Sequence, residues 1–95
     1  MKHGILMHEP DDDVGVAVMD LKKGATVSAL TLEGKPAGRV KLVDRVPLGH
    51  KVAMRELDAE QRVIKYGRPI GKAVKAIARG AHVHVHNVKT LRWSV

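Results

Sequence analysis

Three histidines alternate with valines near the end of the sequence, in residues 81–88. Side chains of a β-strand point to opposite faces in turn, so this spacing predicts a strand with His82, His84 and His86 on one face. Imidazoles in such a row can ligate a metal, exchange protons near neutral pH or bind an anion. The pattern alone leaves all three chemistries open.

A metal site would need more than this row. Two histidines two residues apart on a strand, such as His84 and His86, can chelate one ion, and His50 or another chain could supply a third ligand. However, no carboxylate lies nearby in sequence to orient the rings. Contact with a substrate, or with a metal held by a partner, is therefore an equally economical interpretation.

Two smaller clusters could also bind an anion. His50 and Lys51 follow Gly49, and a turn glycine with two cationic side chains suits a carboxylate. Lys65 and Tyr66 offer a second cation and a phenol. An ordinary polar turn explains the first pair as well, and the only tyrosine of the chain could simply fill the core.

The sequence lacks the parts of a self-contained enzyme. We find no activated nucleophile, no glycine-rich phosphate loop and no paired-carboxylate site. Because the chain has no cysteine, it cannot form disulfides, thiolate zinc sites or a cysteine nucleophile. The chain is thus a poor candidate for a complete catalyst.

The charge balance favours an anionic partner. Seventeen Lys and Arg against ten Asp and Glu leave a net charge of +7. With one Trp, one Tyr and no Phe, the chain lacks the stacking aromatics of single-strand nucleic-acid binders, and no segment resembles a helix-turn-helix. The first apolar segment is too short for a signal peptide and none reaches membrane-spanning length. We therefore expect a cytoplasmic protein without nucleic-acid or membrane partners.

Length and composition predict one small, mostly β domain spanning residues 1–95, because its core must use many β-branched side chains. We expect an acidic, solvated turn at 9–13, and a single helical turn at 58–61. The expected strands, besides the histidine row, cover residues 4–8, 14–19, 29–32, 39–43, 52–54, 63–67 and 68–74.

One short pattern recurs along the chain: an apolar residue, two spacers, Gly, two spacers and Val. It occupies residues 21–27, 46–52 and 77–83, and a fourth copy at 57–63 has Glu60 in place of Gly. The pattern predicts an apolar anchor, a tight turn with positive φ at the glycine, and the start of a strand. Since the copies are unevenly spaced, they indicate a repeated local device and not a solenoid.

Four ordered motifs, at residues 47–53, 63–67, 69–71 and 84–90, resemble the SAF-type domain of altronate and galactarate dehydratases. The resemblance extends from about residue 8 to 93 and implies a β-clip fold beside a larger catalytic part. The ending, residues 84–93, is as similar to the small subunits of sulfolactate sulfo-lyases. Two departures are Glu60, and His82 where the dehydratases tend to have a bulky apolar residue.

The resemblance implies a lyase that eliminates a β leaving group from a hydroxy acid such as altronate or, alternatively, sulfolactate. Such chemistry normally needs a base and a metal. A divalent metal, iron by the resemblance, is expected in a large partner subunit, because this chain lacks carboxylate clusters. The small subunit, inactive alone, would contribute catalytic His84 and His86 and the substrate-binding residues His50, Lys51, Lys65, Tyr66 and Asn87.

Docking onto the large subunit is expected to involve residues 89–95, where Arg92 and Trp93 are typical interface anchors. Two alternatives from other classes remain: a non-catalytic module that binds an anionic ligand, and a self-associating domain whose histidines are only solvated surface.

Overall fold

The structure is a computed structural model that describes residues 3–65, 68–84 and 87–90. These residues form nine strands and no helix, and nothing among them is a helix able to span a membrane. The strands are β1 (His3–Met7), β2 (Val14–Ala17), β3 (Thr26–Thr31), β4 (Pro36–Lys41), β5 (Lys51–Ala53), β6 (Arg62–Lys65), β7 (Arg68–Ala73), β8 (His82–Val83) and β9 (Val88–Thr90). The prediction of a mostly β fold is confirmed.

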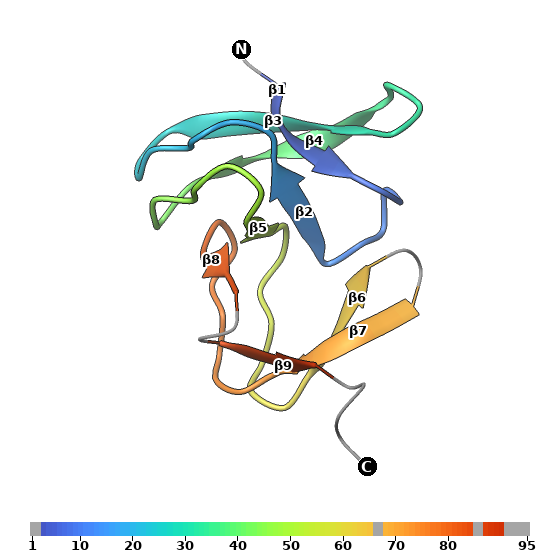
Figure 1. The fold of residues 1–95 in the computed structure, drawn as a ribbon, viewed down its shortest axis with the longest axis vertical. Coiled ribbons are helices and arrows are strands. Elements are labelled where there is room, and N and C mark those ends of the chain that lie inside the picture. The colour runs from blue at the N-terminus through green and yellow to red at the C-terminus, as the bar shows by residue number, and fades with distance from the viewer. Residues whose placement is uncertain (1–2, 66–67, 85–86, 91–95) are drawn as a thin grey trace.

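The strands make two sheets (Figure 1). The larger has the order β4-β3-β1-β2-β5-β8, in which only the β1–β3 pair is parallel. The smaller has the order β6-β7-β9 and is antiparallel. In β3 the buried residues Val27, Ala29 and Thr31 alternate with more exposed neighbours, as expected for a strand that covers a core on one face.

Two hydrophobic clusters lie on opposite sides of β5. Val52 belongs to the first cluster with Ile5, Met7 and Leu42 among others, whereas its neighbour Ala53 belongs to the second. Consecutive residues of a strand face opposite ways, so β5 forms a wall between the two clusters. Both residues are fully buried.

The four-copy turn pattern is confirmed. The apolar anchors pair with one another, Leu21 with Val46 and Leu57 with Ile77. Each turn has a positive φ at its fourth position: 86° at Gly24, Gly49 and Gly80, and 72° at Glu60. The helical turn expected at 58–61 is wrong, because these residues belong to the copy of this turn that carries Glu60. It is closed by the Gln61 amide, which donates to the Asp58 carbonyl.

Glu60 keeps the glycine-like conformation and forms an ion pair with Lys72 at 2.7 Å. The hydrogen bond from Lys72 and its positive charge lower the pKa of the Glu60 carboxyl. The departure from the turn pattern therefore changes the side-chain contacts and leaves the turn itself intact.

The four turns dock in two reciprocal pairs. The amide of Gly24 donates to Leu42 and that of Gly49 to Ala17, so each turn of the first pair caps the strand that precedes the other. The second pair repeats this arrangement, with Glu60 donating to Ala73 and Gly80 to Ala53. Residues 14–53 and 51–83 are thus two similar units that share β5.

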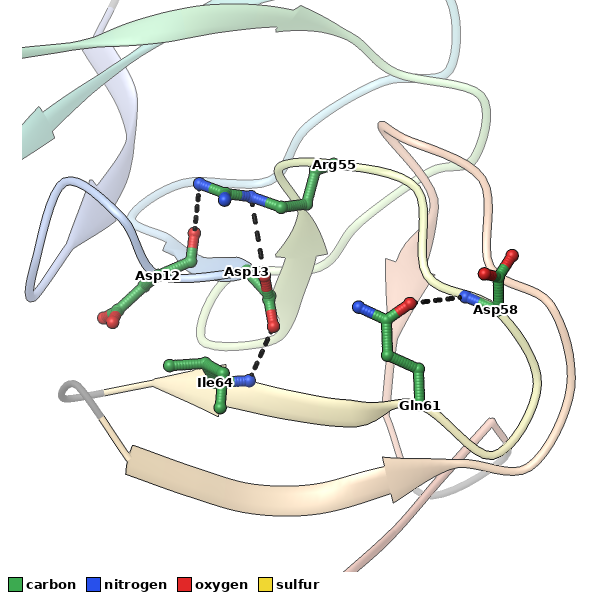
Figure 2. Close-up of polar contacts among 6 residues, drawn as sticks. All are labelled: Asp12, Asp13, Arg55, Asp58, Gln61 and Ile64. Carbon is green, nitrogen blue, oxygen red and sulfur yellow. Dashed lines mark hydrogen bonds and ion pairs between the residues drawn. The ribbon is translucent and has the colours of Figure 1, made fainter.

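A buried acidic residue joins the two units (Figure 2). The Asp13 amide donates to the Ile64 carbonyl at 2.8 Å, and its carboxylate accepts the Ile64 amide at 2.8 Å. Arg55 Nε lies 3.5 Å from the same carboxylate. Asp12 and Asp13 are buried, so the expected solvated turn is wrong for these two, and only Asp11 of the triplet is exposed.

The histidine row is not one continuous strand. β8 ends at Val83, and the amides of Asn87 and Val88 both donate to the His84 carbonyl, which turns the chain into β9 of the other sheet. Residues 85–86 lie outside the described part of the chain, so the predicted position of His86 is not tested.

A cluster of three histidines as the candidate functional site

The imidazoles of His50, His82 and His84 stack against one another. The ring centroids of His50 lie 4.2 Å from those of His84 and 4.9 Å from those of His82, while His82 and His84 are 5.8 Å apart. Nδ1 of His50 and Nε2 of His82 form a hydrogen bond of 2.7 Å. One ring nitrogen from each histidine lies within 4.8 Å of the others.

The strand register explains why these three meet. In the antiparallel pair β5–β8, Val52 is opposite His82 and Lys51 is opposite Val83. Opposite residues share a face, and continuing the register by one residue places His50 opposite His84. All three rings therefore lie on one face of the β5–β8 pair, where β8 is the edge strand of the larger sheet.

The backbone of β8 is held by two side chains from other segments. The Asn87 amide oxygen accepts the His84 amide at 3.0 Å, and its nitrogen donates to the His82 carbonyl at 2.7 Å. The carboxylate of Asp44 accepts the His82 amide at 3.0 Å. These bonds fix both histidines at their main chain.

His50 is positioned by the second of the four turns. Its amide donates to the Pro47 carbonyl, and its carbonyl accepts the Ala17 amide. An added Cβ at Gly49 would meet no atom within 4 Å, so the positive φ alone explains the glycine. His50 and His82 are half-buried and His84 is exposed, which leaves one side of the cluster open to solvent.

Two of the predicted site residues, His50 and His84, are thus brought together. They are joined by His82, which the sequence had set apart as a departure from the dehydratase pattern. The structure consequently changes the composition of the row: His50 from β5's turn occupies a place in it, whereas His86 and Tyr66 lie outside the described residues.

The two lysines are not part of this cluster. Lys51 follows His50 in an extended strand and therefore points to the opposite face of the sheet. Lys65 is only 8% exposed and ends β6, which lies on the other side of the lower half from β8 (Figure 1). Strand alternation and topology thus place both lysines away from the histidine cluster, and their predicted binding of the substrate stays a prediction.

Asn87 has a structural role beside the cluster, and its predicted binding of the substrate stays a prediction. Its side chain is 3% exposed and both ends of its amide bind backbone groups of the histidines. The amide therefore holds the main chain of both histidines in place. Asp44, its counterpart on the other side of His82, was missed because it lies 38 residues away and carries no spacing signal.

The cluster can perform two kinds of chemistry. Stacked imidazoles joined by a short hydrogen bond can accept and donate protons, and in their protonated form they attract a carboxylate or a sulfonate. In their neutral form they present nitrogen lone pairs, which suit a borderline-soft divalent metal.

Comparison with known proteins identifies the relatives of this chain. The chain is 39% identical to the (2R)-sulfolactate sulfo-lyase subunit alpha of Chromohalobacter salexigens over 94 residues, which cover 98% of this chain and 100% of that protein. A second sulfo-lyase subunit alpha, from Paracoccus pantotrophus, is 54% identical over 48 residues, covering 50% of this chain and 72% of that protein.

The dehydratases match over a much smaller share of their own length. The altronate dehydratase of Bacillus subtilis is 36% identical over 90 residues, which are 95% of this chain and 17% of the dehydratase. The altronate/galactarate dehydratase SAF domain, as a family, matches residues 3–91. The resemblance seen in the four sequence motifs is thereby confirmed, and the chain belongs to the altronate/galactarate dehydratase SAF domain family.

Proposed function

We propose that this chain is the small accessory subunit of a lyase that removes a β leaving group from a hydroxy acid. The observation that carries the proposal is the similarity to a sulfo-lyase subunit alpha along 98% of this chain and the whole of that protein. The word subunit implies that a further chain completes the relative's enzyme. A small chain whose candidate site is a histidine cluster suits the role of an accessory subunit in such an assembly.

Sulfolactate, or a hydroxy acid like it, is our first choice of substrate. Two relatives named as sulfo-lyase subunits support it, one of them matched over its full length. A sugar acid such as altronate is the alternative, supported by the dehydratases, in which the matched region is a small part of a longer chain. Both reactions break a bond β to a carboxylate.

The large partner is expected to carry the metal and the base for this reaction. Elimination next to a carboxylate requires a base at the α-carbon and stabilisation of the charge that develops. Within the described part of the chain, the group of converging metal-binding side chains consists of three histidines and no carboxylate. This subunit would therefore bind the charged end of the acid, or donate a proton to its leaving group, through the exposed side of His84 and its neighbour His50.

The test is reconstitution of activity. The chain would be combined with the second subunit of the C. salexigens enzyme, and release of sulfite from (2R)-sulfolactate and dehydration of altronate would be followed in parallel. We expect one of the two reactions with both chains present and neither reaction with this chain alone. Turnover by the purified chain alone at enzyme-like rates would contradict the accessory role.

Two histidine variants address the site. His84→Ala and His50→Ala are expected to lower the activity of the assembled enzyme by about a hundredfold or more, the usual contribution of a proton donor. His3→Ala is the matched control, since His3 pairs with Ser28 at the start of the chain. Full activity in both cluster variants would remove the histidines from the mechanism, and tight, strongly salt-dependent oligonucleotide binding would favour a binding module instead.

A further inference from the structure

We infer that His50, His82 and His84 form a binding site in this chain for one divalent transition-metal ion, such as Zn²⁺, Co²⁺ or Fe²⁺. The sequence pointed to His84 and His86 as ligands, whereas the fold supplies the third imidazole from the turn before β5. This inference concerns a metal held by the small subunit itself. It uses the same histidines as the proposed lyase reaction, but it is tested by metal binding to this chain alone and depends neither on that reaction nor on a metal of a large partner.

The first support is convergence. Three histidines from two segments 32 residues apart place one ring nitrogen each within 4.8 Å of the others. Three ligands bound to one ion at about 2.0–2.1 Å have their donor atoms roughly 3–3.5 Å apart, so the rings must rotate to bring their nitrogens closer together. The rings need to turn because they now lie within 10–25° of parallel.

The second support is a prepared main chain. Asn87 holds the backbone of His82 and His84, Asp44 holds His82, and the turn hydrogen bonds hold His50. Folding thus already brings the three ligands together, so that less entropy is lost when an ion binds. Only side-chain rotations remain, and the exposed ring of His84 has room for them.

The third support is the chemistry of the donor set. Neutral imidazole suits Zn²⁺, Fe²⁺, Co²⁺, Ni²⁺ and Cu²⁺, whereas Ca²⁺ and Mg²⁺ prefer oxygen ligands. Three protein ligands leave at least one coordination position for water or for an oxygen of a small acid, as in metal sites that are not purely structural. The exposed side of the cluster is where that position would open.

Metal binding has to replace the hydrogen bond between His50 and His82. One of the two nitrogens, 2.7 Å apart, carries the shared hydrogen, which must move to the other nitrogen of its ring or to solvent before both can donate lone pairs to an ion. Both nitrogens can then act as ligands while the rings stay neutral. The metal-free protein keeps the ring positions through this bond, which explains how the site stays assembled without an ion.

The experiment titrates the full chain, free of any histidine tag and stripped with a chelator, with Co²⁺. We expect the visible absorption bands of a low-coordinate cobalt site, saturation at one ion per chain by native mass spectrometry, and displacement by Zn²⁺ but not by Mg²⁺ or Ca²⁺. Absence of the bands at millimolar Co²⁺ would overturn the inference.

Variants decide whether these three side chains are the ligands. Loss of a residue that only supports a metal ligand commonly lowers metal affinity by about 10–100-fold, and loss of a ligand itself should lower it at least as much. The variants His50→Ala, His82→Ala and His84→Ala should therefore each weaken Co²⁺ binding by at least about tenfold. His3→Ala and His8→Ala are the controls and should bind as the parent does. Circular dichroism reports folding, and should the two half-buried variants unfold, the exposed His84→Ala alone decides: unchanged binding there refutes the site.

Discussion

The Asn87 side chain links the backbones of the two histidines on either side of Val83. Replacing it with Asp keeps the shape and the acceptor for the His84 amide but removes the donor to the His82 carbonyl. It also places a carboxylate at a position only 3% exposed. Because an unsatisfied buried group typically costs about 1–3 kcal/mol, Asn87→Asp should lower the free energy of unfolding by that amount in urea denaturation.

A matched control for this change is Gln61→Glu. Its amide oxygen accepts the Asp58 amide at 2.9 Å in an exposed turn, and a carboxylate can accept the same bond. The exposed change should alter stability by no more than about 0.5 kcal/mol. Equal effects of the two substitutions would show that Asn87 does not hold the histidines in place.

At the residue scale, the sequence predicted which neighbouring side chains share a strand face better than it predicted which side chains from distant segments meet. Histidines two apart were expected on one face, and His82 and His84 indeed lie side by side, since that rule depends only on strand geometry. The meeting of His50 with His84 depends on the β5–β8 register, which is a long-range property. Which of His50 and Lys51 faces the histidines of β8 likewise depends on this register.

The four turns illustrate what is predictable at the scale of elements. Their positive φ follows from glycine at a fixed offset from an apolar anchor, so the pattern was readable in the sequence. The docking of the turns could not be read from the sequence, because the spacing from anchor to glycine is the same in each copy. The strand end against which a turn packs differs from copy to copy. The sequence predicted a longer strand than β8, because the alternation of histidine and valine continues past Val83. In the structure the amides of Asn87 and Val88 donate to the His84 carbonyl, and this turn ends the strand.

Two glycines of the same motif should respond differently to alanine. Gly24 has positive φ with no atom within 4 Å of an added Cβ, so Gly24→Ala carries only the conformational cost, about 1 kcal/mol. Gly80 has the same φ, but its Cβ would overlap the carbonyl oxygen of Lys41. Gly80→Ala should therefore cost about 1–3 kcal/mol more, the usual penalty of overpacking.

Urea denaturation of both variants measures this difference directly. A loss of stability that is the same in the two proteins would mean that the turn at residues 77–83 does not pack closely on the end of β4. The hydrogen bond from the Val43 amide to the Gly80 carbonyl supports the close packing, since it brings the same two segments together.

At the scale of the molecule, the reciprocal docking of the turns makes two similar units around a shared strand. The mostly β class followed from composition. The presence of two similar units did not, because they have the same kind of apolar anchor and turn but differ in the spacing between the turns. Each of the two clusters of apolar side chains lies mainly on one unit, although Val14 of the first unit belongs to the second cluster, and β5 contributes to both. Contacts between the units then decide whether the chain unfolds in one step.

Asp13 is the clearest such contact. Asp13→Ala would leave the Ile64 amide without its carboxylate acceptor and Arg55 without its ion pair, while the backbone bond to the Ile64 carbonyl can persist. The expected loss is about 1–3 kcal/mol of unfolding free energy. Hydrogen exchange should show the Ile64 amide losing protection more than amides of β3, because the damage is local to the junction.

Two companion variants make this prediction specific to the carboxylate's position. Asp13→Asn retains an oxygen that can accept the Ile64 amide, so it should recover most of the stability and the slow exchange. Asp11→Ala removes a neighbouring exposed carboxylate and should change neither quantity. If Asp13→Ala instead behaves like Asp11→Ala, the two units are held together by their apolar packing against β5, and the buried carboxylate adds no measurable stability.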